Sequence, residues 1–125
     1  MTTFQIINLI IGPQLIGIIM LLVGFIQYRF PPKHINKYYG YRMGLALKNQ
    51  QTWDAANSYS GKLMMKIGLI CIVGGIALAL ILGSHAEPAM PLLAMASGIA
   101  SPIVMMVMTE KYMDKTFDKD GNALL

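Results

Sequence analysis

The sequence predicts an all-α integral membrane protein with three transmembrane helices and a cytoplasmic amphipathic helical segment, at the membrane interface, between the first two. Of its 125 residues, 55% are hydrophobic and only 13% are charged, whereas a soluble domain carries roughly a quarter charged residues. Three apolar runs, at about 4–27, 63–82 and 90–108, each approach the ~20 residues that cross a ~30 Å hydrocarbon core. The whole chain, 1–125, is therefore expected to form one membrane domain.

The first apolar run is expected to be a retained helix and not a cleaved signal peptide. No Lys or Arg precedes it, and it is longer than the apolar core of a signal peptide. Pro13 cannot donate a backbone hydrogen bond, so a kink is expected there. Gly17 and Gly24 lie seven residues apart and give this helix a small-residue face. Two prolines, beginning at Pro31, are expected to end it.

The distribution of basic residues predicts the orientation. Lys and Arg accumulate in the loops on the cytoplasmic side of a membrane. The segment 29–62 contains six of them and the tail 109–125 contains three, whereas the amino terminus and the turn at 83–91 contain none. We therefore expect a multi-pass protein of the cytoplasmic membrane, with its N-terminus outside and its C-terminus inside. Topology explains the net charge of +4, so no binding of nucleic acid is expected.

The second span contains a glycine repeat. Gly61, Gly68 and Gly75 recur every seven residues on one helix face, and small residues let membrane helices pack closely. The alternative is that glycine is simply common in such helices. If the repeat is a packing face, it joins helices of one chain or forms a homo-oligomer. The third span offers a matching set of small residues at Ala94, Gly98 and Ser101.

The segment before the second span predicts a helix with one polar stripe. Asn49 is a favourable N-cap, and Trp53, Asn57 and Gly61 follow it at intervals of four on one side. This helix is expected either to lie at the interface or to continue into the second span. Two amides and one indole are too polar to face lipid and too specific in kind for an ordinary solvated face.

Arg42 lies between Gly40 and Gly44, where the chain can bend sharply. Its guanidinium can bind carbonyl groups, carboxylates or lipid phosphates. Two interpretations stay open: these polar residues converge on a ligand or partner, or they cap helix ends and tie the hairpin to the bundle. The candidate binding residues are Asn36, Gly40, Tyr41, Arg42, Asn49, Trp53 and Asn57.

Enzymatic chemistry is not indicated. His34 and His85 fall on opposite sides of the predicted membrane, and no carboxylate lies in mid-span. The single cysteine, Cys71, cannot form an intramolecular disulfide. The tail segment 118–122 resembles part of a calcium loop but is better explained as a turn. We expect no catalytic residue, no metal site and no cofactor.

The candidate binding residues of the loop and of the helix after it, taken together, resemble the SdpI family of bacterial membrane proteins. The resemblance implies a three-helix domain linked to immunity against a secreted, membrane-active peptide toxin. It also implies an association with signalling, through a transcriptional repressor held at the membrane. The tail from Glu110 to Gly121 is similar to the end of the family pattern as well. The matching positions are Asn36, Gly40-Tyr41-Arg42, Lys48-Asn49, Trp53, Ala56-Asn57 and Gly61.

Three functions follow as hypotheses. The first is a non-enzymatic protein of the bacterial cytoplasmic membrane that gives resistance to a membrane-active peptide toxin. The second is a signalling module that docks a cytoplasmic regulator. The third is a small transporter-like subunit, which would need several copies to enclose a path. The expected partners are membrane lipids, a peptide toxin, a cytoplasmic regulator or further copies of the chain.

Overall fold

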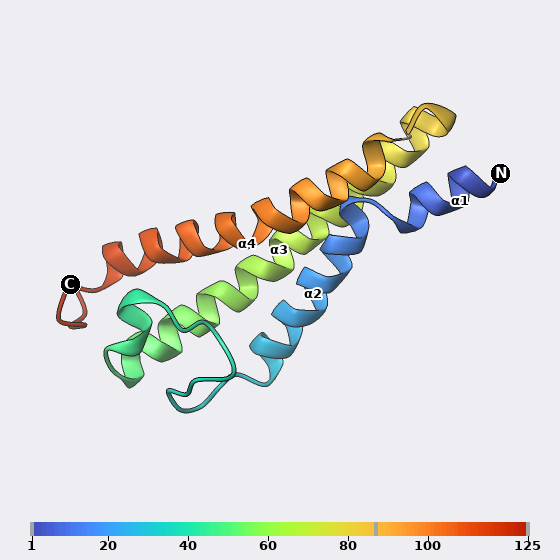
Figure 1. The fold of residues 1–125 in the computed structure, drawn as a ribbon. Helices are drawn as coiled ribbons and strands as arrows, with labels where there is room; N and C mark the ends of the chain where they lie inside the picture. Colours follow the sequence, from blue (N-terminus) through green and yellow to red (C-terminus); the bar gives the residue numbers. More distant parts are fainter. Residues whose placement is uncertain (1, 87, 125) are drawn as a thin grey trace.

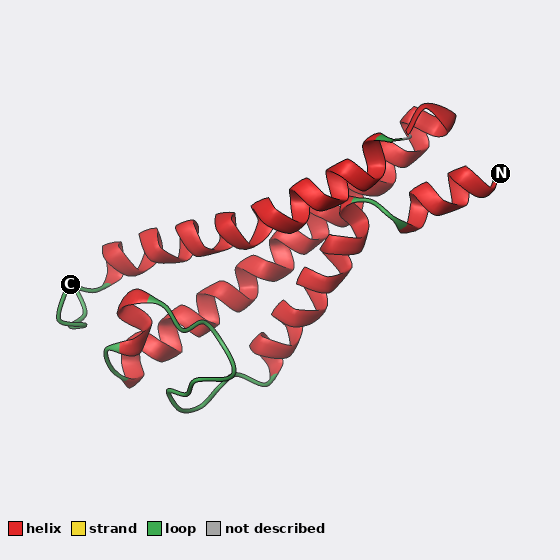
Figure 2. Ribbon diagram, viewed as in Figure 1, coloured by secondary structure: helices red, strands yellow, loops and turns green. Residues whose placement is uncertain are grey.

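The computed structural model describes residues 2–86 and 88–124. Within them the regular elements are all helices, as Figures 1 and 2 show. Three stretches, Thr3–Arg29, Gln50–Leu82 and Ala89–Thr116, are long and apolar enough to cross a membrane. The predicted all-α class with three spans is therefore confirmed. The elements are α1 (Thr3–Ile10), α2 (Pro13–Arg29), η1 (Gly44–Leu47), α3 (Gln50–Leu82), η2 (Gly83–Ala86) and α4 (Ala89–Thr116).

The first span is broken, and the expectation of one kinked helix was wrong. α1 ends at Ile10, Gly12 is extended, and α2 starts with Pro13 at its first position (Figure 1). A proline inside a helix removes one hydrogen bond and clashes with the preceding turn, whereas the first turn of a helix tolerates it. The chain therefore restarts its helix at Pro13 instead of bending through it.

The predicted interfacial helix is not a separate element in the described residues. Asn49 caps α3 as expected, and residues 50–62 are the first turns of one helix that continues to Leu82. At 1.5 Å per residue, its 33 residues extend about 50 Å, well beyond a ~30 Å hydrocarbon core. Part of α3 thus lies outside the hydrocarbon region, where polar side chains are tolerated.

The glycine repeat of α3 packs against α2, whereas the sequence had suggested the small residues of α4 as its matching face. A Cβ atom added to Gly68 would lie 2.6 Å from the carbonyl oxygen of Gly17, and one added to Gly24 would lie 2.7 Å from that of Gly61. Each distance is shorter than any real contact, so these two helix backbones touch. The matching seven-residue spacing of Gly17 and Gly24 explains the choice of partner.

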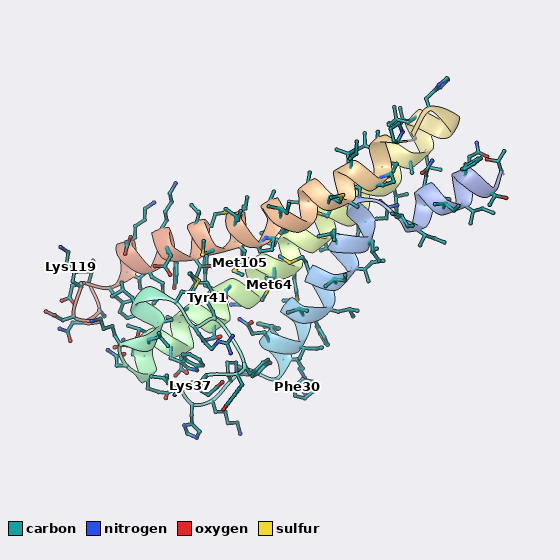
Figure 3. All side chains as sticks on the ribbon, viewed as in Figure 1. Phe30, Lys37, Tyr41, Met64, Met105 and Lys119 are labelled. Carbon is teal, nitrogen blue, oxygen red and sulfur yellow. The ribbon has the colours of Figure 1, made fainter. Side chains whose placement is uncertain are left out.

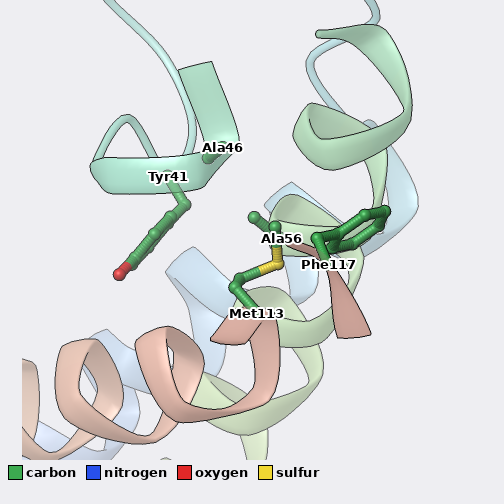
Figure 4. Packing of buried hydrophobic residues seen from close by; sticks show 5 residues of the cluster. All are labelled: Tyr41, Ala46, Ala56, Met113 and Phe117. Carbon is green, nitrogen blue, oxygen red and sulfur yellow. The ribbon is translucent and has the colours of Figure 1, made fainter. Parts of the chain in front are cut away.

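The larger buried hydrophobic cluster lies at one end of the bundle, which we call the loop end. It contains the loop 30–49, the start of α3 and the end of α4 (Figure 1). A buried cluster joins all three parts, as Figure 4 shows. Along the spans many large apolar side chains face outward, as lipid contact requires; Ile81, for example, is 79% exposed. A smaller buried cluster, with Ala79 and Met90, lies near the other end. The members of the larger cluster are Tyr41, Ala46, Ala56, Met113 and Phe117.

Candidate functional site

The loop between the first two spans is held against α3 by three side chains of that helix. The Trp53 indole is fully buried, and its Nε1 donates to the carbonyl oxygen of Pro32 at 2.8 Å. Gln50 Nε2 donates to the carbonyl oxygen of Lys33 at 2.6 Å. The Pro32 carbonyl is buried and needs such a partner, because a buried unpaired group costs about 1–3 kcal/mol, whereas the bond to Lys33 lies at the surface. We call Gln50, Trp53 and the next residue of the stripe, Asn57, the loop clamp.

Asn57 makes the densest set of bonds in the loop clamp. Its Oδ1 accepts the backbone N–H of Tyr41 at 2.5 Å, and its Nδ2 donates to the carbonyl oxygens of Tyr41 at 3.2 Å and Trp53 at 3.0 Å. The side chain therefore pairs with the loop as a neighbouring strand would. Gly40 makes the approach possible: its φ is +102°, and a Cβ atom there would collide with Asn57 Oδ1.

A second carboxamide, that of Gln27 in α2, hydrogen-bonds to α3 beside the loop clamp. Gln27 is buried, and its Nε2 donates to the Asn57 carbonyl oxygen at 2.9 Å and to Ser60 Oγ at 2.7 Å. Beside it, a hollow of about 260 Å³ opens between the end of α2 and α3. Most of its wall is apolar, and Asp54 and Ser58 supply polar groups at its rim. Residues 27, 54 and 58 were not among the predicted site residues.

Asn36 and Arg42 organise the exposed part of the loop. Asn36 Oδ1 accepts the backbone N–H groups of Tyr38 and Tyr39, which is a local turn typical of asparagine. Arg42 is exposed and donates from Nη1 to the carbonyl oxygen of Lys37 at 2.6 Å. Both residues thus fold the exposed part of the loop, residues 36–39 and Arg42, which we call the loop tip. In the described residues, neither side chain hydrogen-bonds to Trp53 or Asn49.

Tyr41, labelled in Figure 3, joins the loop to α4. Its side chain is 5% exposed, and its hydroxyl donates to Glu110 Oε1 at 2.5 Å. Burial, followed by the hydrogen bond and the negative charge of Glu110, raises the pKa of Tyr41 well above its ordinary value. The phenol of Tyr41 therefore stays protonated at neutral pH. The sequence placed Glu110 at the start of the family-like tail but gave no sign that it meets Tyr41, because 69 residues separate the two.

Asn49 joins the start of α3 to the tail. Its Oδ1 accepts the backbone N–H of Thr52, in a capping box, and its Nδ2 donates to the carbonyl oxygen of Gly121 at 2.9 Å. The tail is the predicted turn: Asp118 Oδ1 accepts the N–H groups of Asp120 and Asn122, both at 2.9 Å. Among the described residues, no cluster of three potential metal ligands occurs.

The structure thus divides the predicted residues into groups. Gly40, Tyr41, Trp53 and Asn57 come together around one buried hydrogen-bond network, as the loop and α3 meet. Asn49 lies nearby at the helix cap, whereas Asn36 and Arg42 lie in the exposed tip. The side-chain polar atoms of Asn49, Trp53 and Asn57 all form hydrogen bonds with other groups of this chain.

This arrangement can be compared with known proteins. The family model for the SdpI/YfhL protein family matches residues 33–109, which contain the loop clamp, the loop tip and the glycine repeat. The chain belongs to the SdpI/YfhL protein family. Another protein of similar sequence, the uncharacterized protein YfhL of Bacillus subtilis (strain 168), is 37% identical over 95 residues, or 76% of this chain and 79% of YfhL. No solved structure matches.

The SdpI/YfhL match confirms the family that the loop motif indicated. Together with the three apolar helices, it identifies a multi-pass membrane protein. The matched range begins at residue 33, after α2, so the residues that pack against the glycine repeat from α2 lie outside it.

Proposed function

We propose that this chain is a non-enzymatic protein of the bacterial cytoplasmic membrane that gives immunity or resistance to a membrane-active peptide toxin. Membership of the SdpI/YfhL family is the observation that carries the proposal. The three apolar helices support it, because they would place the chain where such a toxin acts. In the proposed orientation, the loop end and the tail are cytoplasmic and the N-terminus is outside, in keeping with the basic loop and tail.

In this proposal the loop has two parts with different roles. The loop clamp fixes the backbone, because its side chains are bonded to loop carbonyl and N–H groups. The loop tip is what remains for a partner: Tyr38 is 90% exposed, and Lys37 and Arg42 are exposed beside it. A toxin peptide, or the toxin's target, would bind at this tip or along the helix faces next to it.

A toxin-survival assay tests the proposal. A sensitive host expresses the wild type, Arg42→Ala in the loop tip, or Lys33→Ala as a control that removes an exposed charge elsewhere in the loop. The panel consists of purified membrane-permeabilising peptides, and a blot measures the protein in the membrane. Protection by the wild type and by Lys33→Ala, lost in Arg42→Ala at equal abundance, is expected. Full-level wild type that protects against no peptide of the panel would contradict the proposal.

The exposed loop tip also favours a second function, the docking of a cytoplasmic regulator. A basic and aromatic surface on a rigid support suits a partner with an acidic face. Cross-linking from position 38 in intact membranes, followed by mass spectrometry, is the direct test. A soluble protein captured by the wild type and lost in Arg42→Ala would support this function over immunity.

A further inference from the structure

A second hollow, away from the loop clamp, lies between α3 and α4. It has a volume of about 250 Å³ and is lined by Tyr59 of α3 and by Met108, Lys111, Tyr112 and Lys115 of α4. The rings of Tyr59 and Tyr112 stack face to face, with centroids 4.2 Å apart and planes within 1° of parallel. This stack fixes one wall of the hollow and holds the two helices together there.

The chemistry of this hollow is that of an anion site. Lys111 and Lys115 are four residues apart, so they lie on one face of α4, and both are exposed. The residues that line the hollow bring two positive charges and no carboxylate. Two like charges at this spacing repel each other, and an anion bound between them removes that repulsion. Tyr59 and Tyr112 both line the hollow and are half-buried, so their hydroxyl groups can donate to a ligand there.

The position of the hollow along the helices indicates the source of the anion. Lys111 follows Met108, where the third apolar run ends, by about one helical turn. Tyr59 precedes Leu63, where the second apolar run begins, also by about one turn. Both helices therefore present the hollow just beyond the hydrocarbon, at the depth of lipid headgroups, where tyrosine rings are favoured. The exposed Met108 side chain supplies an apolar neighbour for an acyl chain.

We propose that Tyr59, Lys111, Tyr112 and Lys115 form a binding site for the phosphate group of an anionic phospholipid. The ammonium groups of the two lysines bind the phosphate as point charges, and the phenol hydroxyls donate to its oxygens. A membrane lipid, and not a soluble phosphate, is the ligand, because the site lies at headgroup depth and has an apolar side. The site does not depend on the proposed immunity function.

Lipid retention by the full chain, measured by native mass spectrometry from detergent micelles, tests the site. The wild type is titrated with phosphatidylglycerol and with phosphatidylcholine of the same acyl chains. A juxtamembrane lysine contributes about a fivefold change in affinity for an anionic lipid. The Lys111→Gln/Lys115→Gln variant is therefore expected to retain phosphatidylglycerol roughly 25-fold less well, with retention of phosphatidylcholine unchanged. The control Lys33→Gln/Lys37→Gln removes the same charge from outside the hollow and should lose clearly less phosphatidylglycerol than Lys111→Gln/Lys115→Gln.

Three results would overturn the site. The first is an equal loss of phosphatidylglycerol in both double variants, which would reduce the effect to net charge. The second is unchanged retention in Lys111→Gln/Lys115→Gln. The third is displacement of phosphatidylglycerol by inorganic phosphate at constant ionic strength, which would make the ligand a soluble anion. Since both lysines are exposed, circular dichroism without added lipid should show the same helix content and melting temperature in the wild type and in both double variants. Tyr112→Phe keeps the ring stack, removes one hydroxyl and should cause a smaller loss than the double lysine change.

Discussion

Two pairs of buried carboxamides, one at the loop end and one at the break in the first span, differ in how completely they are hydrogen-bonded. At the loop end, both side-chain polar atoms of Asn57 are bonded, and Gln27 Nε2 donates twice. At the break in the first span, Asn8 and Gln14 are 1% and 2% exposed. There, Asn8 Nδ2, Asn8 Oδ1 and Gln14 Oε1 have no hydrogen-bond partner among the described residues. Burial alone therefore does not reveal what a polar side chain contributes in this protein.

The difference comes from the supply of free backbone groups. An irregular loop offers N–H and carbonyl groups that no helix uses, and Asn57 takes both such groups of Tyr41. A break in a helix frees far fewer backbone N–H and carbonyl groups. Because α1 ends at Ile10, the carbonyl of Asn8 loses its helical partner, and Gln14 Nε2 donates to it at 2.7 Å. Gln14 Oε1 instead faces α3 at Gly75, within a helix whose backbone is already paired.

The largest effect is expected for Asn57→Ala. The change leaves the Tyr41 N–H and its carbonyl buried without their partner, and each orphaned group costs about 1–3 kcal/mol. We expect unfolding in mixed detergent micelles to be easier by at least about 2 kcal/mol, with greater protease cleavage of the loop. Ser58→Ala, on the exposed neighbouring position, is the matched control and should change little. Equal stability of Asn57→Ala and Ser58→Ala would contradict the role of the loop clamp.

A smaller effect, visible only at high pH, is expected from Tyr41. Its pKa is raised in the folded protein, so its contribution to stability is complete below the unfolded tyrosine pKa of about 10 and is lost as the pH rises above it. The wild type should lose up to about 1.4 kcal/mol per pH unit more than Tyr41→Phe in that range. Melting followed by circular dichroism between pH 8 and 11.5 measures this. Tyr38→Phe, at a 90% exposed position, should keep the steeper slope of the wild type.

The smallest effect, and one of opposite sign, is expected at the break. Asn8→Leu removes two polar atoms that have no partner, so stability should stay the same or rise by up to about 1 kcal/mol. Gln14→Leu, in contrast, breaks the bond to the Asn8 carbonyl and should lower stability. Both are measured by the same micelle unfolding. Clear destabilisation by Asn8→Leu would show that this amide has a partner, and the contrast between the two ends would disappear.

Local sequence signals were enough for the spans and for much of the loop. Hydropathy located the three helices, the capping preference of Asn49 located the start of α3, and the spacing of Trp53 and Asn57 placed them on one side. Partners far apart in sequence were not predictable: Glu110 meets Tyr41 across 69 residues, and a lone glutamate carries no pattern. The break at Gly12 was missed because a proline can either kink a helix or start one.

The bond from Asn49 to Gly121 sets an order of events during synthesis. It joins residues 72 apart, so the ribosome must add all of them before the tail can reach the start of α3. At ~5–20 residues per second, that interval is roughly 4 to 14 s. During this interval the cap of α3 can form its local bonds between Asn49 and Thr52 but not the bond from Asn49 to the tail. The loop end therefore becomes complete only after the third span has been made.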